Sequence, residues 1–277
     1  MKKIIALILI FAVAAFTLSA CDFPLITVLD KNATQAPTDS ISATEGASGN
    51  VEKNTKPGDE SGTAAPTEEA KPQVSANVDD YIATMREERF NYDDHGTGVD
   101  QTFSIPKFLL NSVDANRVND EINTEFSKYF EDAEDAMSKG YSLNTYNIYY
   151  DKYLFADVAG VVIHASFNGG NKQLRAYSFD VSTGKLLDNK SFCEKLGLDY
   201  NMYMSDLKAA VSEDYTGKYS NLPDNDSYRD KTLGDDNLES SAAIVDSFGS
   251  VYGVVSEFAA IGGGCFDAVV TVYNNGM

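Results

Sequence analysis

Apolar side chains recur every three or four residues over one long stretch near the middle of the chain. Between Ala115 and Lys139 they stand at Val118, Ile122, Phe126, Phe130, Ala133 and Met137. This spacing places them on one face of a helix. Ser112 or Asp114 can cap its start, and Gly140 is a typical stop signal. We therefore predict one long amphipathic helix.

Residues 145–187 have a different pattern, in which aromatic and β-branched side chains form runs typical of strands. Asn168-Gly169-Gly170 lies between two of these runs and favours a hairpin turn, because glycine readily adopts positive φ. A second reversal is expected at Ser182-Thr183-Gly184. The pattern predicts three strands that pair in order as an antiparallel meander.

The C-terminal part of the chain has shorter periodic segments. We expect a helix over residues 201–215, an acidic loop after it, and a short helix over 238–245. Two apolar strands, residues 251–261 and 265–273, close the chain and are joined by three glycines.

The segment before the long helix has weaker signals. Val78, Ile82, Met85 and Phe90 are roughly consistent with a short helix. Residues 99–110 alternate as in a strand, which Pro106 must end or place at a sheet edge. Runs of strands with helices at intervals predict an α+β domain, with a mainly antiparallel sheet, two or three packed helices and a disordered linker before it.

The first 20 residues have the three parts of an export signal, namely two lysines, the uncharged run Ile4 to Phe16 and small residues. Thirteen residues are too few to span a bilayer as a helix, which needs roughly 20. The tetrapeptide ending at Cys21, "LSAC", resembles the lipobox of bacterial lipoproteins, in which that Cys receives a diacylglyceryl group and becomes the new N-terminus. We expect residues 1–20 to be a lipoprotein signal peptide and Cys21 to be lipidated, which anchors the protein to the cell membrane, facing outside the cytoplasm.

Residues 21–76 form the expected lipidated N-terminus and linker. From Asp30 to Ala76 the chain is rich in Thr, Ser, Pro and Glu and has almost no large apolar side chains. Such a composition does not bury enough surface to offset the entropy of ordering, so the stretch reads as disordered. As a flexible coil its ends would lie about 40 Å apart. The folded domain is then expected at residues 77–277.

The chain carries a net charge of −20, which becomes −22 when Lys2 and Lys3 leave with the signal peptide. Of this, −17 belongs to residues 77–277, once −1 for residues 21–29 and −4 for residues 30–76 are set aside. An acidic surface repels nucleic acids and attracts basic proteins, unless the acidity serves solubility alone. Nucleic acid is therefore excluded as an expected partner.

Three cysteines are present, and two remain once Cys21 is assigned to lipid. A disulfide between Cys193 and Cys265 is permitted outside the cytoplasm, but sequence alone does not show that the two sulfurs approach each other.

Several side chains invite a chemical interpretation without forming a catalytic signature. His95 and His164 are the only histidines and lack zinc-ligand spacing, so we expect no metal and no cofactor. The run of aspartates over residues 224–236 lacks the EF-hand pattern and reads as a solvated acidic loop, with calcium binding left open. A third group combines five aromatic rings, which either cover a second layer or bind a sugar or protein. They are Tyr146, Tyr149, Tyr150, Tyr153 and Phe155.

Residues of the meander also resemble a known family. Phe179-Asp180, Thr183-Gly184-Lys185 and Phe192 match the signature that follows a hairpin in RsiV-like extracytoplasmic domains, and Asn123 matches its upstream helix. That uncharacterised domain family includes the lysozyme-sensing ectodomain of an anti-sigma factor and domains attached to peptidoglycan deacetylases. The resemblance implies a binding or sensing module at the cell envelope.

Together these observations predict a non-enzymatic, membrane-anchored lipoprotein whose domain binds a cationic protein such as lysozyme, or another cell-wall ligand. Two alternatives stay open, an envelope enzyme with an unrecognised site and an accessory lipoprotein of a membrane complex.

Overall fold

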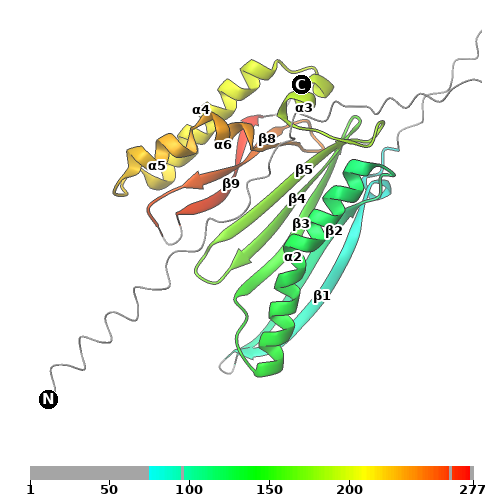
Figure 1. Ribbon diagram of the computed structural model, residues 1–277, viewed down its shortest axis with the longest axis vertical. Helices are drawn as coiled ribbons and strands as arrows, with labels where there is room; N and C mark the ends of the chain where they lie inside the picture. The colour runs from blue at the N-terminus through cyan, green and yellow to red at the C-terminus, as the bar shows by residue number, and fades with distance from the viewer. Residues whose placement is uncertain (1–74, 95–96, 262–263, 275–277) are drawn as a thin grey trace, which may run out of the picture. The chain divides into compact units, whose positions relative to one another are not determined.

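The computed structural model describes residues 75–94, 97–261 and 264–274 (Figure 1). The signal peptide, Cys21, nearly all of the linker and His95 lie outside the described residues, so the predictions made for them stay predictions.

Helices and strands alternate in groups along the chain, which confirms an α+β fold with mostly antiparallel pairing. The elements are the short 3-10 helix η1 (Val78–Asp80), β1 (Ile82–Asp94), β2 (Thr97–Phe108), α2 (Val113–Lys139), β3 (Thr145–Phe155), β4 (Val158–Phe167), β5 (Lys172–Asp180), β6 (Lys185–Leu186), α3 (Asn189–Leu196), α4 (Tyr200–Tyr219), α5 (Asn225–Thr232), α6 (Asp235–Glu239), β7 (Ala242–Val245), β8 (Val251–Phe258) and β9 (Cys265–Tyr273).

The strands form two sheets. The larger has the order β1-β2-β3-β4-β5-β6 and contains the predicted meander as β3, β4 and β5. Its β2 and β3 pair in parallel through the single partner pair Phe103 and Ile148. The smaller sheet has the order β7-β8-β9 and is antiparallel throughout.

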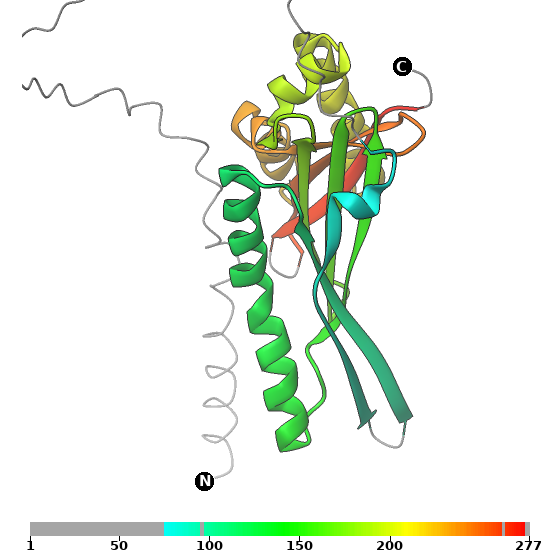
Figure 2. The same cartoon turned by 90° about the vertical axis from the view of Figure 1, so that its right-hand side faces the viewer.

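Helix α2 packs along one face of the larger sheet (Figure 2). The side chain of Ser112 accepts a hydrogen bond from the backbone N–H of Ala115 at 3.0 Å, and Gly140 ends the helix at φ 70°. The buried face of α2 matches the predicted one except that Met137 is only half-buried. We call α2 with this sheet the α2 layer.

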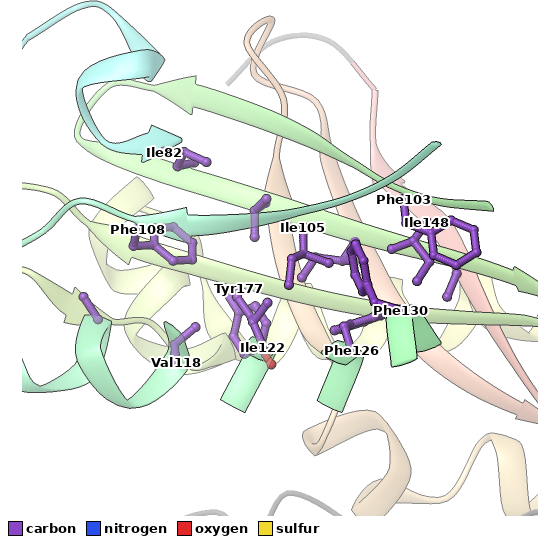
Figure 3. Packing of buried hydrophobic residues seen from close by; sticks show 14 of the residues in the cluster. Ile82, Phe103, Ile105, Phe108, Val118, Ile122, Phe126, Phe130, Ile148 and Tyr177 are labelled. Carbon is purple, nitrogen blue, oxygen red and sulfur yellow. The ribbon is translucent and has the colours of Figure 1, made fainter. Parts of the chain in front are cut away.

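Aromatic rings fill much of the α2 layer's core (Figure 3). Phe103 lies 4.8 Å from Phe90 and 5.6 Å from Phe130 between ring centroids, and its ring meets Phe130 edge-on. Such arrangements add to the stabilisation from buried area. Strand residues of β2 and helix residues of α2 are thereby locked together.

Helices α3 to α6 accompany the smaller sheet and form the second layer, called here the α4 layer (Figure 1). Helix α4 confirms the helix predicted at 201–215 and extends it at both ends. Its buried side chains come every four residues and pack with β8 and β9. They are Tyr203, Leu207, Val211 and Tyr215.

The two layers meet on the face of the larger sheet that α2 leaves open. Val162 and Leu174 of the larger sheet pack against Ile244 and Val254 of the smaller one. A buried hydrogen bond, from the hydroxyl of Ser178 to the backbone carbonyl of Ala243 at 2.7 Å, joins them. The layers are therefore connected by a small apolar cluster and buried polar contacts.

Three predictions for local structure are wrong. The helix expected around residues 78–90 is the short η1 followed by β1, whose bulge between Thr84 and Arg86 disturbs the strand alternation. The helix expected over 238–245 ends at Glu239, because the apolar segment after it pairs with β8 as β7. The acidic loop contains helices α5 and α6.

The predicted effect of Pro106 is also partly wrong, because β2 continues to Phe108. Pro106 is paired with Thr84, directly beside the bulge of β1. The parallel pairing of β2 with β3 is confined to Phe103. Proline has no backbone N–H to donate. It is tolerated at this position because β2 forms no ladder hydrogen bonds with β3 there.

Candidate functional site

One face of β3 and β4 combines exposed aromatic rings with carboxylates. Ile148 and Ile163 point toward α2 and are fully buried. Because side chains alternate along a strand, Tyr149 and His164 point the other way, and the two are direct partners across the β3–β4 ladder. Asp151 follows on the same face of β3.

The three side chains are in contact. The ring of Tyr149 stacks on the imidazole of His164, with centroids 4.5 Å apart and planes only 2° from parallel. The Nε2 atom of His164 lies 3.1 Å from Oδ2 of Asp151. Tyr149 is 41% exposed, and nearly half of the Asp151 side chain is exposed as well.

The imidazole of His164 favours the neutral form. Burial lowers the pKa of His164 below its usual value and outweighs the opposing charge of Asp151. The lowered pKa of His164 therefore favours an uncharged imidazole at neutral pH.

The same face extends onto the smaller sheet. The hydroxyl of Tyr252 donates a hydrogen bond to Oδ2 of Asp246 at 3.0 Å. Burial, together with the nearby charge of Asp151 and the Tyr252–Asp246 pair, raises the pKa of Tyr153 to about 12. We call this surface the tyrosine–carboxylate face, defined by Tyr149, Asp151, Tyr153, His164, Asp246 and Tyr252.

A rigid turn at the β7–β8 reversal adds an exposed phenylalanine. Asp246 Oδ1 accepts hydrogen bonds from the backbone N–H groups of Phe248 at 2.8 Å and Ser250 at 2.9 Å. Gly249 has a φ of 84°, and a Cβ there would lie 3.0 Å from the Phe155 ring. These contacts hold Phe248 with 82% of its surface exposed.

This arrangement is suited to binding positive charge. Aromatic faces attract lysine and arginine through the quadrupole of the ring, and nearby carboxylates add direct charge attraction. The imidazole of His164 contacts the ring of Tyr149 and the carboxylate of Asp151.

The aromatic cluster predicted from sequence is split by the fold. Tyr150 lies on the face of β3 that packs against the core under α2 and shares a hydrogen bond with Thr84 at 2.8 Å, while Phe155 packs into the α4 layer. Tyr146 and Tyr149 remain exposed. Some of these rings therefore pack between layers, as Phe155 does, and others, such as Tyr146 and Tyr149, are exposed at the surface.

The cysteines named in the disulfide hypothesis are thiols in this structure. Cys193 is buried in the core of the α4 layer, where burial raises the pKa of its thiol to about 11. Cys265 is half-buried at the start of β9. The bridge between them stays a prediction.

The residues that carry the RsiV-like resemblance lie mostly at the β5–β6 turn, while Phe192 belongs to α3 and Asn123 to α2. Asp180 Oδ1 accepts hydrogen bonds from the hydroxyl of Ser182 at 2.6 Å and from Lys195 at 2.9 Å. Burial opposes its ionisation, but these hydrogen bonds lower the pKa of Asp180 below its usual value. Gly184 completes the turn at φ 71°, where a Cβ would lie 2.8 Å from Cβ of Ser112.

Sequence reasoning missed a buried acid in β8. Glu257 is fully buried and accepts a hydrogen bond from Lys218 at 3.1 Å. Burial, reinforced by Asp214, raises the pKa of Glu257 to about 7. Its position as the one charged residue of a mostly apolar strand was the signal that could have identified it.

The acidic segment at 224–236 does not gather its carboxylates into a cluster. Within the described ranges, no group of three or more His, Cys, Asp or Glu side chains is placed to hold a metal ion. Among the helices of those ranges, none is both long and apolar enough to cross a bilayer.

Comparisons with known proteins give weak matches to solved structures. No model of a protein family matches the chain, and no curated protein matches it. A DUF3298 family member from Bacteroides fragilis is 11% identical, with a TM-score of 0.34 over 69% of this chain and 89% of that one. A DUF3298 family protein from Pseudomonas aeruginosa is 10% identical, also with a TM-score of 0.34, over 71% and 93%. Similarity at this level carries no argument about function.

Proposed function

We propose that the chain is a lipid-anchored, non-enzymatic binding or sensing module outside the cytoplasm, and that its domain binds a basic protein such as lysozyme. The anchor and the location rest on Cys21 and the residues before it. The observation that carries the binding proposal is the tyrosine–carboxylate face, where an exposed ring and a half-exposed carboxylate lie side by side.

The charge of the domain supports this partner class. Residues 77–277 carry −17, so a basic protein is attracted before it makes contact. Charge of this kind mainly raises the association rate and is screened by salt. Direct contacts at the face would then supply the specificity that long-range attraction lacks.

Titration of the mature chain, with Cys21→Ser to keep it in solution, against lysozyme tests the proposal. We expect binding that weakens as salt is raised, and an affinity about fivefold lower for Tyr149→Ala because one cation–aromatic contact is lost. Asp151→Asn is expected to weaken binding by a similar factor.

Two matched controls lie elsewhere on the molecule. Tyr141→Ala removes another exposed tyrosine, at the end of α2, and Glu131→Gln removes an exposed charge on α2. Both are expected to change the affinity less than about twofold. Absence of binding by the unaltered chain at low salt would refute this partner class.

A further inference from the structure

We propose that Tyr149, Asp151 and His164 form a seat for one cationic side chain of the partner, a lysine or an arginine, and that the seat holds it only while His164 is neutral. This inference rests on the proposed function and assigns its central contact and its regulation.

The stack with His164 fixes the ring of Tyr149. The centroid distance of 4.5 Å and the angle of 2° mean that the imidazole covers one side of the phenol ring. The ring still has 41% of its surface exposed, so it is held rigidly and remains accessible. A preorganised aromatic ring binds a cation without a further cost for ordering the side chain.

Asp151 supplies the charge of the seat. Residues two apart on a strand lie on the same face, about 7 Å from each other, so one guanidinium or ammonium group can reach both the ring of Tyr149 and the carboxylate. The carboxylate lies 3.1 Å from Nε2 of His164. A neutral imidazole brings no positive charge to this contact, so the carboxylate stays available to the cationic side chain.

Protonation of His164 would prevent the cationic side chain from binding at the seat. The imidazolium would pair with Asp151, cancel its charge and repel an arriving cation. The groups that act on His164 are Asp151, which favours protonation, and Lys172 of β5, which disfavours it together with burial. The imidazolium and the arriving cation thus compete for the carboxylate of Asp151, so a proton on His164 and a bound cation each lower the affinity for the other.

Binding of lysozyme at pH 7.5 and at a pH below the midpoint of the His164 titration, which NMR measures directly, tests the competition. We expect the affinity to be about fivefold lower at the lower pH, because a surface charge pair is lost. His164→Phe keeps an aromatic partner for Tyr149 but never ionises, so its affinity is expected to be the same at both pH values. Glu257→Gln is the control for a buried group whose pKa is raised to about 7, and it is expected to retain the pH dependence of the unaltered chain.

A small probe tests the seat separately from the protein partner. The chain has two histidines, so its imidazole NMR signals are few, and His95→Gln assigns the signal of His164. L-arginine amide at saturating concentration is expected to lower the pKa of His164 read from that signal, and Asp151→Asn is expected to abolish this shift.

Failure of the seat and failure of the proposed function would give different results. If lysozyme binds the unaltered chain but neither pH nor His164→Phe changes the affinity, the seat is refuted and the proposed function stands. If lysozyme does not bind but L-arginine amide shifts the His164 titration, the partner class is refuted and the seat stands. An unchanged titration in the presence of L-arginine amide refutes the seat.

Discussion

Helices α2 and α4 each cover a sheet, but they bury different chemistry. The buried face of α2 is wholly apolar, with Phe126 and Phe130 at its centre. The buried face of α4 includes the phenols Tyr203 and Tyr215, and beside α4 lies the buried carboxylate of Glu257. The α2 layer is therefore stabilised by apolar area, whereas the stability of the α4 layer depends on how its polar groups are satisfied.

The largest effect is expected in the aromatic core of the α2 layer. Phe130→Ala should lower the free energy of unfolding by about 4 kcal/mol, because it removes a fully buried ring and leaves a cavity against Phe103. Urea denaturation measures this change. Phe248→Ala is the control, since that ring is 82% exposed and its removal should cost less than about 0.5 kcal/mol. Equal losses would show that the α2 layer is not a close-packed core.

A close approach in the α4 layer allows a second test. A Cβ on Gly253 of β8 would lie 2.4 Å from Cδ1 of Leu207, so Gly253→Ala should destabilise the protein by about 2 kcal/mol through overpacking. In a Leu207→Ala background the same change should cost much less, which a double-mutant cycle would detect.

The matched control for this glycine is on α4 itself. A Cβ on Gly217 would meet no heavy atom within 4 Å outside the backbone of its own helix, so Gly217→Ala should stabilise the helix by up to about 1 kcal/mol. Additive costs for Gly253→Ala and Leu207→Ala would contradict close packing between β8 and α4 at this point.

Glu257 should make the α4 layer sensitive to pH. Its pKa is raised from 4.5 to about 7 on folding, so its stabilising contribution is complete below about pH 4.5 and is lost as pH rises through 7. The Gln side chain of Glu257→Gln does not ionise. The free energy of unfolding of this variant should therefore rise relative to that of the unaltered chain as pH increases from 4.5, by about 2 kcal/mol at pH 8. Denaturation at pH 5 and pH 8 measures the difference.

The exposed Glu213 on α4 provides the control for that experiment. Glu213→Gln should show a difference from the unaltered chain that is the same at both pH values. A Glu257→Gln variant with no pH-dependent gain would mean that Glu257 is ionised with an ordinary pKa in the folded protein.

The smallest effect is expected at Tyr203. Its hydroxyl is buried without a hydrogen-bond partner among the described residues. Tyr203→Phe removes an unsatisfied polar group and keeps the ring, so it should be neutral or stabilise the protein by up to about 1 kcal/mol. A marked loss of stability would show that the hydroxyl has a partner and would weaken the contrast between the layers.

Local signals explain which elements could be predicted. The three-to-four-residue spacing along α2, its cap at Ser112 and its stop at Gly140 are readable within the segment, as are the glycines of the β4–β5 turn. The bulge in β1 and the pairing of β7 with β8 depend on a neighbouring strand, which explains why a helix was predicted in both places. Helix α3, capped by Asp188 and ended by Gly197, was missed although both signals are local.

The sequence by itself determined the α+β class, the helices α2 and α4, the meander and the acidic charge, because propensity, periodicity and turn residues act over a few positions. Only the tertiary structure decided that Tyr149 stacks on His164, that Asp151 lies beside them and that Glu257 is buried against Lys218. These contacts join residues from different strands or helices. Their geometry depends on strand register and on the packing of one layer against another, which no local pattern contains.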